Sequence, residues 1–588
     1  MNDFQTIDRR VRLVDMDTPR GRINMDSLIL HPLTLSWASI KHCRNIIFED
    51  HGYLTWTAMT ATTKLRNSLL AILVALLVGR WLIYSIGKAF GLYLKRKTAA
   101  RRQSTLKRVR IEEEAVRSFY RRSQKSEDDD WEKIESYGAA TSTNGSLADS
   151  DWEGIVGFFH PFWFVGLIYT RSKCLLIKSD SNAGGGGERV LWAAIRATQK
   201  RWPKAVCVVY TGDHDATKPS ILERVKVMSR SFDGRDSAHR ADSMMQNRFN
   251  IQLHPPTVVF IYLSTRDWVL SSKYPHFTLL GQSFGSLILG YDAFSLLVPD
   301  IFIDTMGYAF TLALCKFFFP EIPTGAYVHY PTISTDMLGS LDAESGRGLN
   351  AGLGKGWKGT LKRWYWHFFA WMYCWVGGTV DVVMTNSTWT QGHIRSLWGP
   401  NRRKRNKSSN IEVVFPPVAV EELEQAIEIS ESSEARREKA LLYVAQFRPE
   451  KNHVLILRAF SQLLQSNLGD AAKATQDVKL VLVGSVRDDE DKRRVYSLRL
   501  LAYELKIKDQ VEFICDAPWS DILDWLRRSW VGVNGMWNEH FGIGVVEYQA
   551  AGLISVVNDS GGPKEDIVVD WDGGPTGKLH NLEMRGAS

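Results

Sequence analysis

The chain has 588 residues, which is enough for two globular domains with separate cores. Hydrophobic residues make up 44% of it and charged residues 23%, the composition of a globular protein with some membrane character. The formal net charge of +8 does not indicate nucleic-acid binding, because many of the cations gather in one block (95–110) and no nucleic-acid-binding motif accompanies them. The position of this block, just after an apolar run, suits anionic membrane lipid instead.

The apolar run itself, residues 68–94, is long enough to cross a hydrocarbon core, which needs ~20 apolar residues. We therefore expect a transmembrane helix over 67–95, preceded by a polar segment over 1–66. Arg80 and Lys88 lie inside the run and leave an in-plane amphipathic helix as the alternative. Because few cations precede the run and the basic block follows it, the positive-inside rule predicts a lumenal N-terminal segment and a cytosolic remainder.

Residues 96–153 predict a basic and disordered tether. The basic block opens this segment, and the stretches QKSEDDD and TSTNGSLADSD follow with almost no branched apolar residues. Such a composition buries too little apolar surface to fold by itself.

Short Val/Ile-rich runs alternate with helical patterns from residue 154 onward, which is typical of parallel sheets covered on both faces. We expect an α/β protein with two doubly wound, Rossmann-like domains, over 154–415 and 416–588, that face a cleft. The predicted strands lie within 154–161, 205–212, 257–263, 301–307, 324–331 and 381–387 of the first domain, and within 440–446, 478–485, 511–517, 531–535 and 553–560 of the second.

Two regions of the first domain, 284–320 and 365–375, are almost entirely apolar or aromatic. One interpretation is that they form buried core helices. The alternative, which the sequence leaves open, is that they dip into the surface of a bilayer close to a lipid substrate.

The strongest chemical pattern is Glu539-His-Phe-Gly-Ile-Gly-Val-Val-Glu547, between a predicted strand and a helical run. Its glycines predict a loop that turns into a helix near Gly544, with Glu547 in the first helical turn and Glu539 in the loop. Free N–H groups at a helix N-terminus suit a diphosphate. Two carboxylates beside that point can accept hydrogen bonds from sugar and ribose hydroxyls.

The segment NEHFGIGVVEYQAAG resembles the Glu-x7-Glu motif of retaining, metal-independent glycosyltransferases of the GT-B fold. The resemblance covers most of 154–577, and GFFHP, NAGGGGERVLW, AYVHYPTIS, TNSTWT and FRPEKNH also carry it. Within that class the combination is similar to the α-1,2-mannosyltransferases of asparagine-linked glycan assembly. It implies GDP-mannose as donor, a dolichyl-diphosphate-linked oligosaccharide as acceptor and no cofactor. It also implies a place on the cytosolic face of the endoplasmic reticulum membrane, beside other mannosyltransferases of the same lipid-linked oligosaccharide.

The same resemblance assigns roles to residues of the second domain. It implies that Glu539 contacts the donor hexose, that Glu547 binds the ribose hydroxyls and that Lys451 neutralises the donor diphosphate as GDP leaves. Many relatives carry a second cation five positions before this lysine. Gln446 stands there in this chain, and Arg448 is the nearest substitute.

Further donor contacts are expected from glycine-rich turns and from one histidine. Such turns let backbone N–H groups approach a phosphate. His329, at a strand end, is expected to act in the sugar pocket. No metal site is expected, since Asp213-His214-Asp215 is better explained as a surface turn. The remaining donor-binding candidates are Gly185, Gly186, Gly542, Ile543, Gly544, Gly561 and Gly562.

Two features depart from the family pattern. Residues 162–181 form an apolar segment that separates GFFHP from the glycine-rich turn and resembles translated intron. The second domain is predicted to be truncated, because only KLHNLEMRGAS follows GGPTG. The short C-terminus keeps open the alternative of an inactive membrane scaffold for other glycosyltransferases. A transferase that uses another nucleotide sugar is a second alternative, because none of the candidate residues reads the base of the donor. A dehydrogenase is disfavoured because the chain lacks a suitably placed Gly-x-Gly-x-x-Gly.

Overall fold

The fold was analysed in a computed structural model. It describes residues 54–123, 152–159, 186–212, 214, 218, 222, 251, 253–340, 356–408, 410–465, 477–486 and 489–580. Residues 83–588 form one compact unit, and the chain up to Leu82 forms a separate unit. Residues 1–53 of the predicted polar segment 1–66 and the whole of the predicted insertion 162–181 lie outside the described residues.

The first domain is built on a sheet of parallel strands in the order β3-β2-β1-β4-β5-β6-β7. Side chains on its two faces enter two different cores: Val206, Val208 and Tyr210 of β2 face one core, and Cys207 and Val209 face the other. This explains the unbroken apolar run. The strands are β1 (Ile155–Phe159), β2 (Val206–Thr211), β3 (Val258–Tyr262), β4 (Ile301–Asp304), β5 (Thr324–Val328), β6 (Val382–Thr385) and β7 (Glu412–Val413), and the helices are α4 (Gly186–Arg201), α7 (Thr278–Leu296), α8 (Ala309–Phe318), α9 (Thr335–Gly339), α10 (Gly356–Gly377) and α11 (Thr388–Lys404).

The second domain repeats this plan with the parallel order β10-β9-β8-β11-β12-β15. A separate two-stranded antiparallel ribbon joins β13 (Asp570–Trp571) to β14 (Gly574–Pro575). The sheet contains β8 (Glu438–Val444), β9 (Lys479–Gly484), β10 (Val511–Cys515), β11 (Ser529–Asn534), β12 (Ile554–Asn558) and β15 (Lys578–His580), and the helices are α12 (Val420–Ala426), α13 (Glu431–Glu434), α14 (His453–Gln465), α16 (Asp489–Glu504), α17 (Trp519–Arg528) and α18 (Ile543–Ala550).

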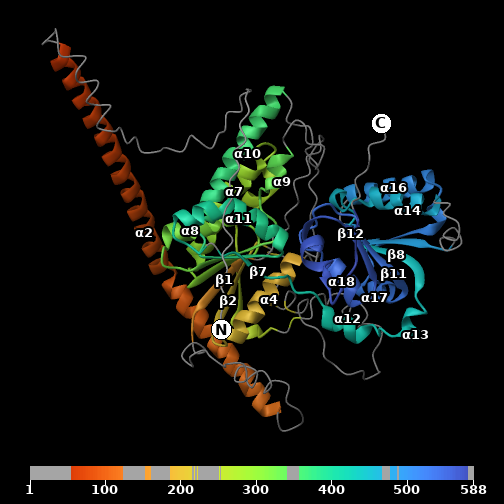
Figure 1. Cartoon of the computed structure of the whole chain (residues 1–588). Coiled ribbons are helices and arrows are strands. Elements are labelled where there is room, and N and C mark those ends of the chain that lie inside the picture. Colours follow the sequence, from red (N-terminus) through yellow and green to blue (C-terminus); the bar gives the residue numbers. More distant parts are fainter. Residues whose placement is uncertain are drawn as a thin grey trace, which may run out of the picture. The chain divides into compact units, whose positions relative to one another are not determined.

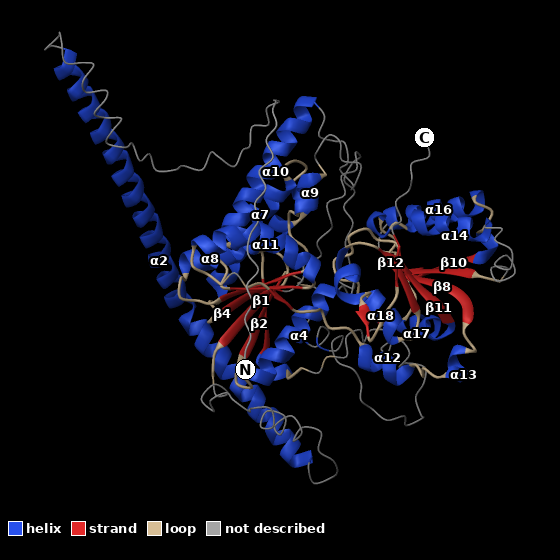
Figure 2. Cartoon of the chain, in the orientation of Figure 1, coloured by secondary structure: helices blue, strands red, loops and turns tan. Residues whose placement is uncertain are grey.

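Both sheets are therefore doubly wound, as the sequence predicts, and every predicted strand is present. Figure 2 shows the two sheets in red with helices covering them. In each sheet the strand order reverses beside the first strand. The reversal lies between β1 and β4 in the first sheet and between β8 and β11 in the second. Ligands of such sheets bind outside the carboxyl ends of the strands at this point.

The N-terminal helix α2 runs from Leu54 to Ser123 (red to orange in Figure 1) and is longer than the predicted membrane segment. It contains a window of mean hydropathy 2.2, and no other helix in the described parts of the chain is long and apolar enough to cross a membrane. Because α2 continues to Ser123, residues 96–123 are helical and the prediction of a disordered tether is wrong for them. The rest of that predicted tether lies almost wholly outside the described residues.

The basic block of α2 also differs from its predicted role. Arg102 makes two parallel hydrogen bonds with Asp300, at 2.8 and 2.7 Å, and the same carboxylate accepts from the backbone N–H of Ile155 at the start of β1. Lys95 pairs with Glu321 at 2.5 Å. These cations attach the helix to the first sheet, so they are not all directed to lipid.

Candidate active site

Lys451 and Glu539 meet at the point where the strand order of the second sheet reverses. Lys451 ends a short 3-10 turn (Pro449–Lys451) after β8, and Glu539 lies in the loop after β11. The Lys451 Nζ is 2.5 Å from Glu539 Oε2 and donates a second hydrogen bond to the Met536 sulfur at 3.1 Å. Among the residues that the structure describes, these are the two hydrogen bonds that the Lys451 ammonium donates, and an ammonium has three hydrogens. One hydrogen is left for an anion.

The Glu539 carboxylate is held in its ionised form. Burial on its own raises its pKa, but the nearby Lys451 and His540 and the hydrogen bonds from Lys451 and Asn534 outweigh burial, so the net shift is downward. The site therefore contains an oriented ion pair between two residues for which the sequence analysis predicts separate roles, one at the donor hexose and one at the donor diphosphate. Such a pair is a fixed arrangement of charge that is in place before a substrate arrives.

Helix α18 presents its N-terminus at the same loop. Gly542 precedes the helix with a φ of +108°, a left-handed conformation that favours glycine, and a Cβ there would lie 2.9 Å from Pro563. A Cβ at Gly544 would meet only the Val444 carbonyl oxygen, at 3.7 Å. The first N–H groups of a helix have no partner within it, and in α18 these include the N–H groups of Ile543 and Gly544.

Glu547 lies just beyond the first turn of α18, whereas the sequence predicts it within that turn. The helix starts at Ile543, which makes Glu547 its fifth residue and leaves the first turn without an acid. Burial raises the pKa of this carboxyl to about 7, and the positive charge of Arg189 opposes the rise. Arg189, in the first turn of α4, was not predicted from the sequence. The only sequence feature that points to this arginine is its position shortly after the glycine-rich turn.

His329, a predicted site residue of the first domain, directly follows β5. Its Nε2 donates to the Thr305 carbonyl oxygen at 3.1 Å, which leaves Nδ1 as a hydrogen-bond acceptor. Burial lowers the pKa of the ring to about 4, so it is neutral near pH 7. Gly186 begins α4, and a Cβ at the next residue, Gly187, would lie 3.5 Å from His329 Nε2. Gly185 lies outside the described residues.

Arg448 has a different environment from Lys451. It precedes the 3-10 turn and lies 3.7 Å from the Glu450 carboxylate.

Gly561 and Gly562 support the loop that carries Glu539. The Gly562 N–H donates to the Glu539 carbonyl oxygen at 2.8 Å. Gly561 has a φ of +68°, and a Cβ there would lie 2.3 Å from that same oxygen. Their observed role is thus close backbone packing, whereas the sequence predicts donor contacts for them.

An aromatic stack that the sequence analysis missed joins this loop to the first domain. The His540 ring lies 4.2 Å from Tyr330 and 5.8 Å from Trp389, both in stacked orientations. Asn538 donates to Asp336 at 2.7 Å beside it. Burial lowers the pKa of His540 to about 4. Tyr330 and His540 lie in motifs that were recognised, but stacking between them depends on the folded arrangement.

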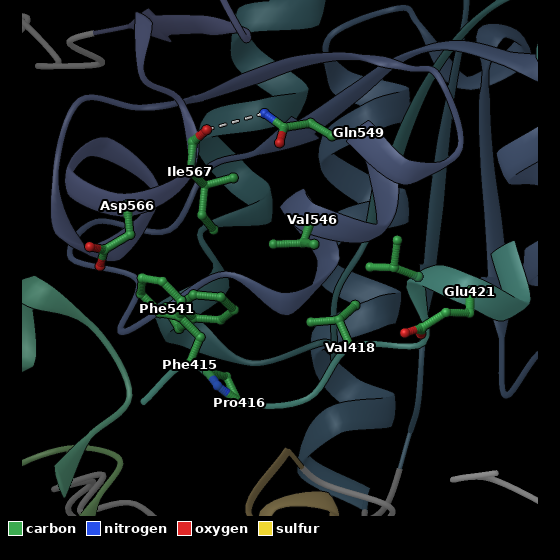
Figure 3. Close-up of a pocket in the computed structure, with 10 residues that line it drawn as sticks. Phe415, Pro416, Val418, Glu421, Phe541, Val546, Gln549, Asp566 and Ile567 are labelled. Carbon is green, nitrogen blue, oxygen red and sulfur yellow. Dashed lines mark hydrogen bonds between the residues drawn. The ribbon is translucent and has the colours of Figure 1, made fainter. Parts of the chain in front are cut away.

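A cavity of about 400 Å³ lies beside α18 and is lined mainly by apolar side chains. Figure 3 shows Val546 and Gln549 of α18 on one side, with Phe415, Pro416 and Phe541 below them. None of the predicted site residues lines this cavity. The candidate site is therefore defined by the ion pair and the turns around it.

Comparison with known proteins first defines the class of protein to which the chain belongs. The family described as "Glycosyl transferases group 1" matches residues 424–579, which contain the ion pair and α18. Together with the two doubly wound sheets, this makes the chain a glycosyltransferase of the GT-B type, as the motifs predict. Among solved structures, an alpha,alpha-trehalose 6-phosphate synthase from Burkholderia multivorans is similar at 13% identity, with a TM-score of 0.45, over 73% of this chain and 88% of that one.

The particular family follows from the closer relatives. The family described as "ALG11 mannosyltransferase N-terminus" matches residues 174–398. A Neurospora crassa protein named "GDP-Man:Man(3)GlcNAc(2)-PP-Dol alpha-1,2-mannosyltransferase" is 56% identical over 90% of this chain and 88% of its own length. A Homo sapiens protein of the same name is 42% identical over 76% of this chain and 79% of its own. The chain belongs to this mannosyltransferase family.

Proposed function

We propose that this chain transfers mannose from GDP-mannose to a dolichyl-diphosphate-linked oligosaccharide with an α-1,2 linkage, in the assembly of the asparagine-linked glycan precursor. Its relatives are named for this donor and acceptor. The observation that carries the proposal is the Lys451–Glu539 pair at 2.5 Å, beside the open N-terminus of α18.

In the proposed reaction the diphosphate of the donor lies at the first N–H groups of α18 and at Lys451. The C1–O bond to the β-phosphate breaks, the acceptor hydroxyl oxygen bonds to C1, and its proton passes to the departing phosphate. Lys451 stabilises the charge that develops on GDP, while Glu539 orients the mannose through its hydroxyls and Glu547 holds the ribose. The configuration at C1 is retained because the acceptor approaches on the face that GDP leaves.

The proposal assigns no metal to this step, since a fixed ammonium and helix N–H groups supply the positive charge that the diphosphate needs. It also places the enzyme at the endoplasmic reticulum membrane, with α2 as a single transmembrane helix and the two sheets on the cytosolic face. The cations that follow the apolar window of α2 support this orientation. Other mannosyltransferases that act on the same lipid-linked oligosaccharide are proposed as its neighbours there.

The test is a transfer assay with membranes that contain the full chain and a Man(3)GlcNAc(2)-diphosphate lipid, with EDTA present. GDP-mannose, GDP-fucose and UDP-glucose are compared as donors. We expect product from GDP-mannose alone, and we expect an α-1,2-specific mannosidase to remove the added sugar. Product from UDP-glucose would assign another nucleotide sugar, and no product from a folded chain would favour the inactive scaffold.

A further inference from the structure

The loop that carries Glu539 is held by the first domain on both sides of this residue. Asn538, which precedes it, donates from its side-chain nitrogen to Asp336 Oδ2 at 2.7 Å. His540, which follows it, stacks its ring on Tyr330 at 4.2 Å. Both partners lie in the part of the first domain that follows β5. The position of the loop therefore depends on contacts between the two domains.

The Glu539 carboxylate itself is hydrogen-bonded within the second domain. Its Oε2 accepts from Lys451 at 2.5 Å and from the Asn534 side chain at 3.5 Å. Three consecutive side chains thus divide between the domains, since the outer two contact the first domain and the middle one contacts the second. A shift of either outer side chain turns the carboxylate between them.

Asn538 suits this link by its backbone as well as by its side chain. Its φ is 53°, a left-handed conformation that Asn and Asp adopt more readily than most other residues. Its backbone N–H donates to Ser560 Oγ at 2.8 Å, which fixes the residue on its own domain. The side-chain amide is then directed to Asp336.

Asp336 has a fixed position on the opposite side of this link. It lies in the first turn of α9, where the Ser334 side chain accepts from the Met337 N–H at 3.0 Å. The preceding residue, Thr335, pairs through its hydroxyl with Nδ1 of His393 on α11 at 2.6 Å. The other ring nitrogen of this histidine lies 3.7 Å from Asp336 Oδ2. The carboxylate is therefore a preorganised acceptor for the amide of the Glu539 loop.

Helix α11 takes part in the same interface through its first two residues. The Thr388 N–H donates to Asp566 of the second domain at 2.8 Å. The Trp389 ring lies stacked with His540 at 5.8 Å, and it meets His393 edge-on at 4.3 Å. Hydrogen bonds and stacked rings together thus join the two domains around this loop.

We infer that Asp336 is a positioning residue for mannose transfer: through its hydrogen bond with Asn538 it sets the orientation of Glu539 toward the donor hexose. The inference rests on the proposed function, because it uses the role assigned there to Glu539. It gives the first domain a part in orienting the donor sugar. Misplacement of an orienting group by ~1 Å costs a rate on the order of 100-fold, so one hydrogen bond is enough to matter.

The test compares Asn538→Asp with the exchanged pair Asp336→Asn/Asn538→Asp in the full chain. The single substitution keeps the shape and the backbone conformation of the residue but places two carboxylates in contact. The exchanged pair restores the hydrogen bond, because the amide at position 336 then donates to the carboxylate at position 538. The matched control is Asn410→Asp, since Asn410 is exposed and also donates to a carboxylate, that of Glu412.

Two quantities are measured for each variant: kcat with saturating GDP-mannose, and Kd for GDP by calorimetry. We expect Asn538→Asp to lower kcat at least about tenfold and to leave Kd unchanged, because GDP carries no hexose for Glu539 to orient. We expect the exchanged pair to regain kcat to within about threefold of wild type. The control should match wild type in both quantities.

Three results would overturn the inference while wild type remains active. One is a wild-type kcat in Asn538→Asp, and another is an exchanged pair that stays as slow as the single variant. The third is a loss of GDP binding along with transfer, which would indicate a general structural role. Absence of product from wild type itself would contradict the proposed function, on which the inference rests, and is distinct from all three.

Discussion

At the scale of single residues, the active site depends on charges that stabilise each other. Burial would favour a protonated Glu539, but Lys451 keeps it ionised. The same contact fixes the ammonium, which the proposed reaction needs at the departing diphosphate. One salt bridge thus prepares both groups, and loss of either changes the other.

Replacing Lys451 with methionine keeps the length of the side chain and removes its charge. We expect kcat to fall roughly 100-fold, as it does when a donor to a developing oxyanion is lost. The measurement is mannose transfer with saturating GDP-mannose. The control is Lys492→Met, on the exposed surface of α16. An unchanged kcat in Lys451→Met would show that the ammonium does not act on the leaving group.

Glu547 predicts a pH dependence of stability. Its pKa is 4.5 in an ordinary environment and about 7 in the folded chain, so between these values the unfolded chain releases a proton that the folded chain keeps. The contribution of Glu547 to stability is therefore most favourable below pH 4.5 and becomes less favourable as pH rises to 7. We expect Glu547→Gln to raise the thermal midpoint relative to wild type, by an amount that grows over this range and is constant above it.

The comparison is made by calorimetry without substrate, with Glu504→Gln as the control for removing a carboxylate from an exposed position. An equal difference in thermal midpoint at all pH values would contradict the account of Glu547.

At the scale of secondary-structure elements, the loops after β11 and β12 pack backbone against backbone. Gly561 allows this contact because it has no Cβ and adopts a positive φ. We expect Gly561→Ala to displace the Glu539 loop, to destabilise the fold by about 1–3 kcal/mol and to lower kcat.

Thermal unfolding and transfer are measured together for this variant. Gly392→Ala is the matched control, because a Cβ at this position on α11 meets no atom within 4 Å. Equal stability of the two variants would mean that the loop accepts a side chain at Gly561.

The exposed tryptophans of α10, Trp364 and Trp371, give a prediction about substrate access. We expect Trp364→Ser/Trp371→Ser to raise KM about tenfold for an acceptor embedded in vesicles, which corresponds to about 1.4 kcal/mol. KM for a short-chain acceptor in detergent and kcat should not change. Tyr496→Ser/Tyr503→Ser is the control, because these side chains are similarly exposed and also seven residues apart, on α16. A rise in KM for both acceptors would point to damage in the active site.

The sequence predicted the strands well and the N-terminal helix poorly, for physical reasons. A strand buried on both faces, such as β2 or β9, reads as an unbroken apolar run. Residues 96–123 are rich in charged side chains, which suggest a solvated segment. The partner of Arg102, Asp300, lies 198 residues away in the chain, so only the folded chain shows how this segment is held.

At the scale of the whole molecule, two sheets of one topology place their functional residues at equivalent points. Lys451 and Glu539 could be predicted because each lies in a motif that follows a strand. The influence of Arg189 on Glu547 and the stacking of His540 on Tyr330 could not. These contacts join the two domains, and no local pattern records them.

The most direct test of the central claim is to compare GDP binding and mannose transfer in the Glu539→Gln variant. Calorimetry measures GDP binding, and the lipid acceptor assay with EDTA measures transfer. We predict that the variant binds GDP but forms no product, whereas wild type and the exposed-strand control Glu512→Gln form product. Transfer by Glu539→Gln at the wild-type rate would contradict the assignment of this carboxylate to the reacting sugar.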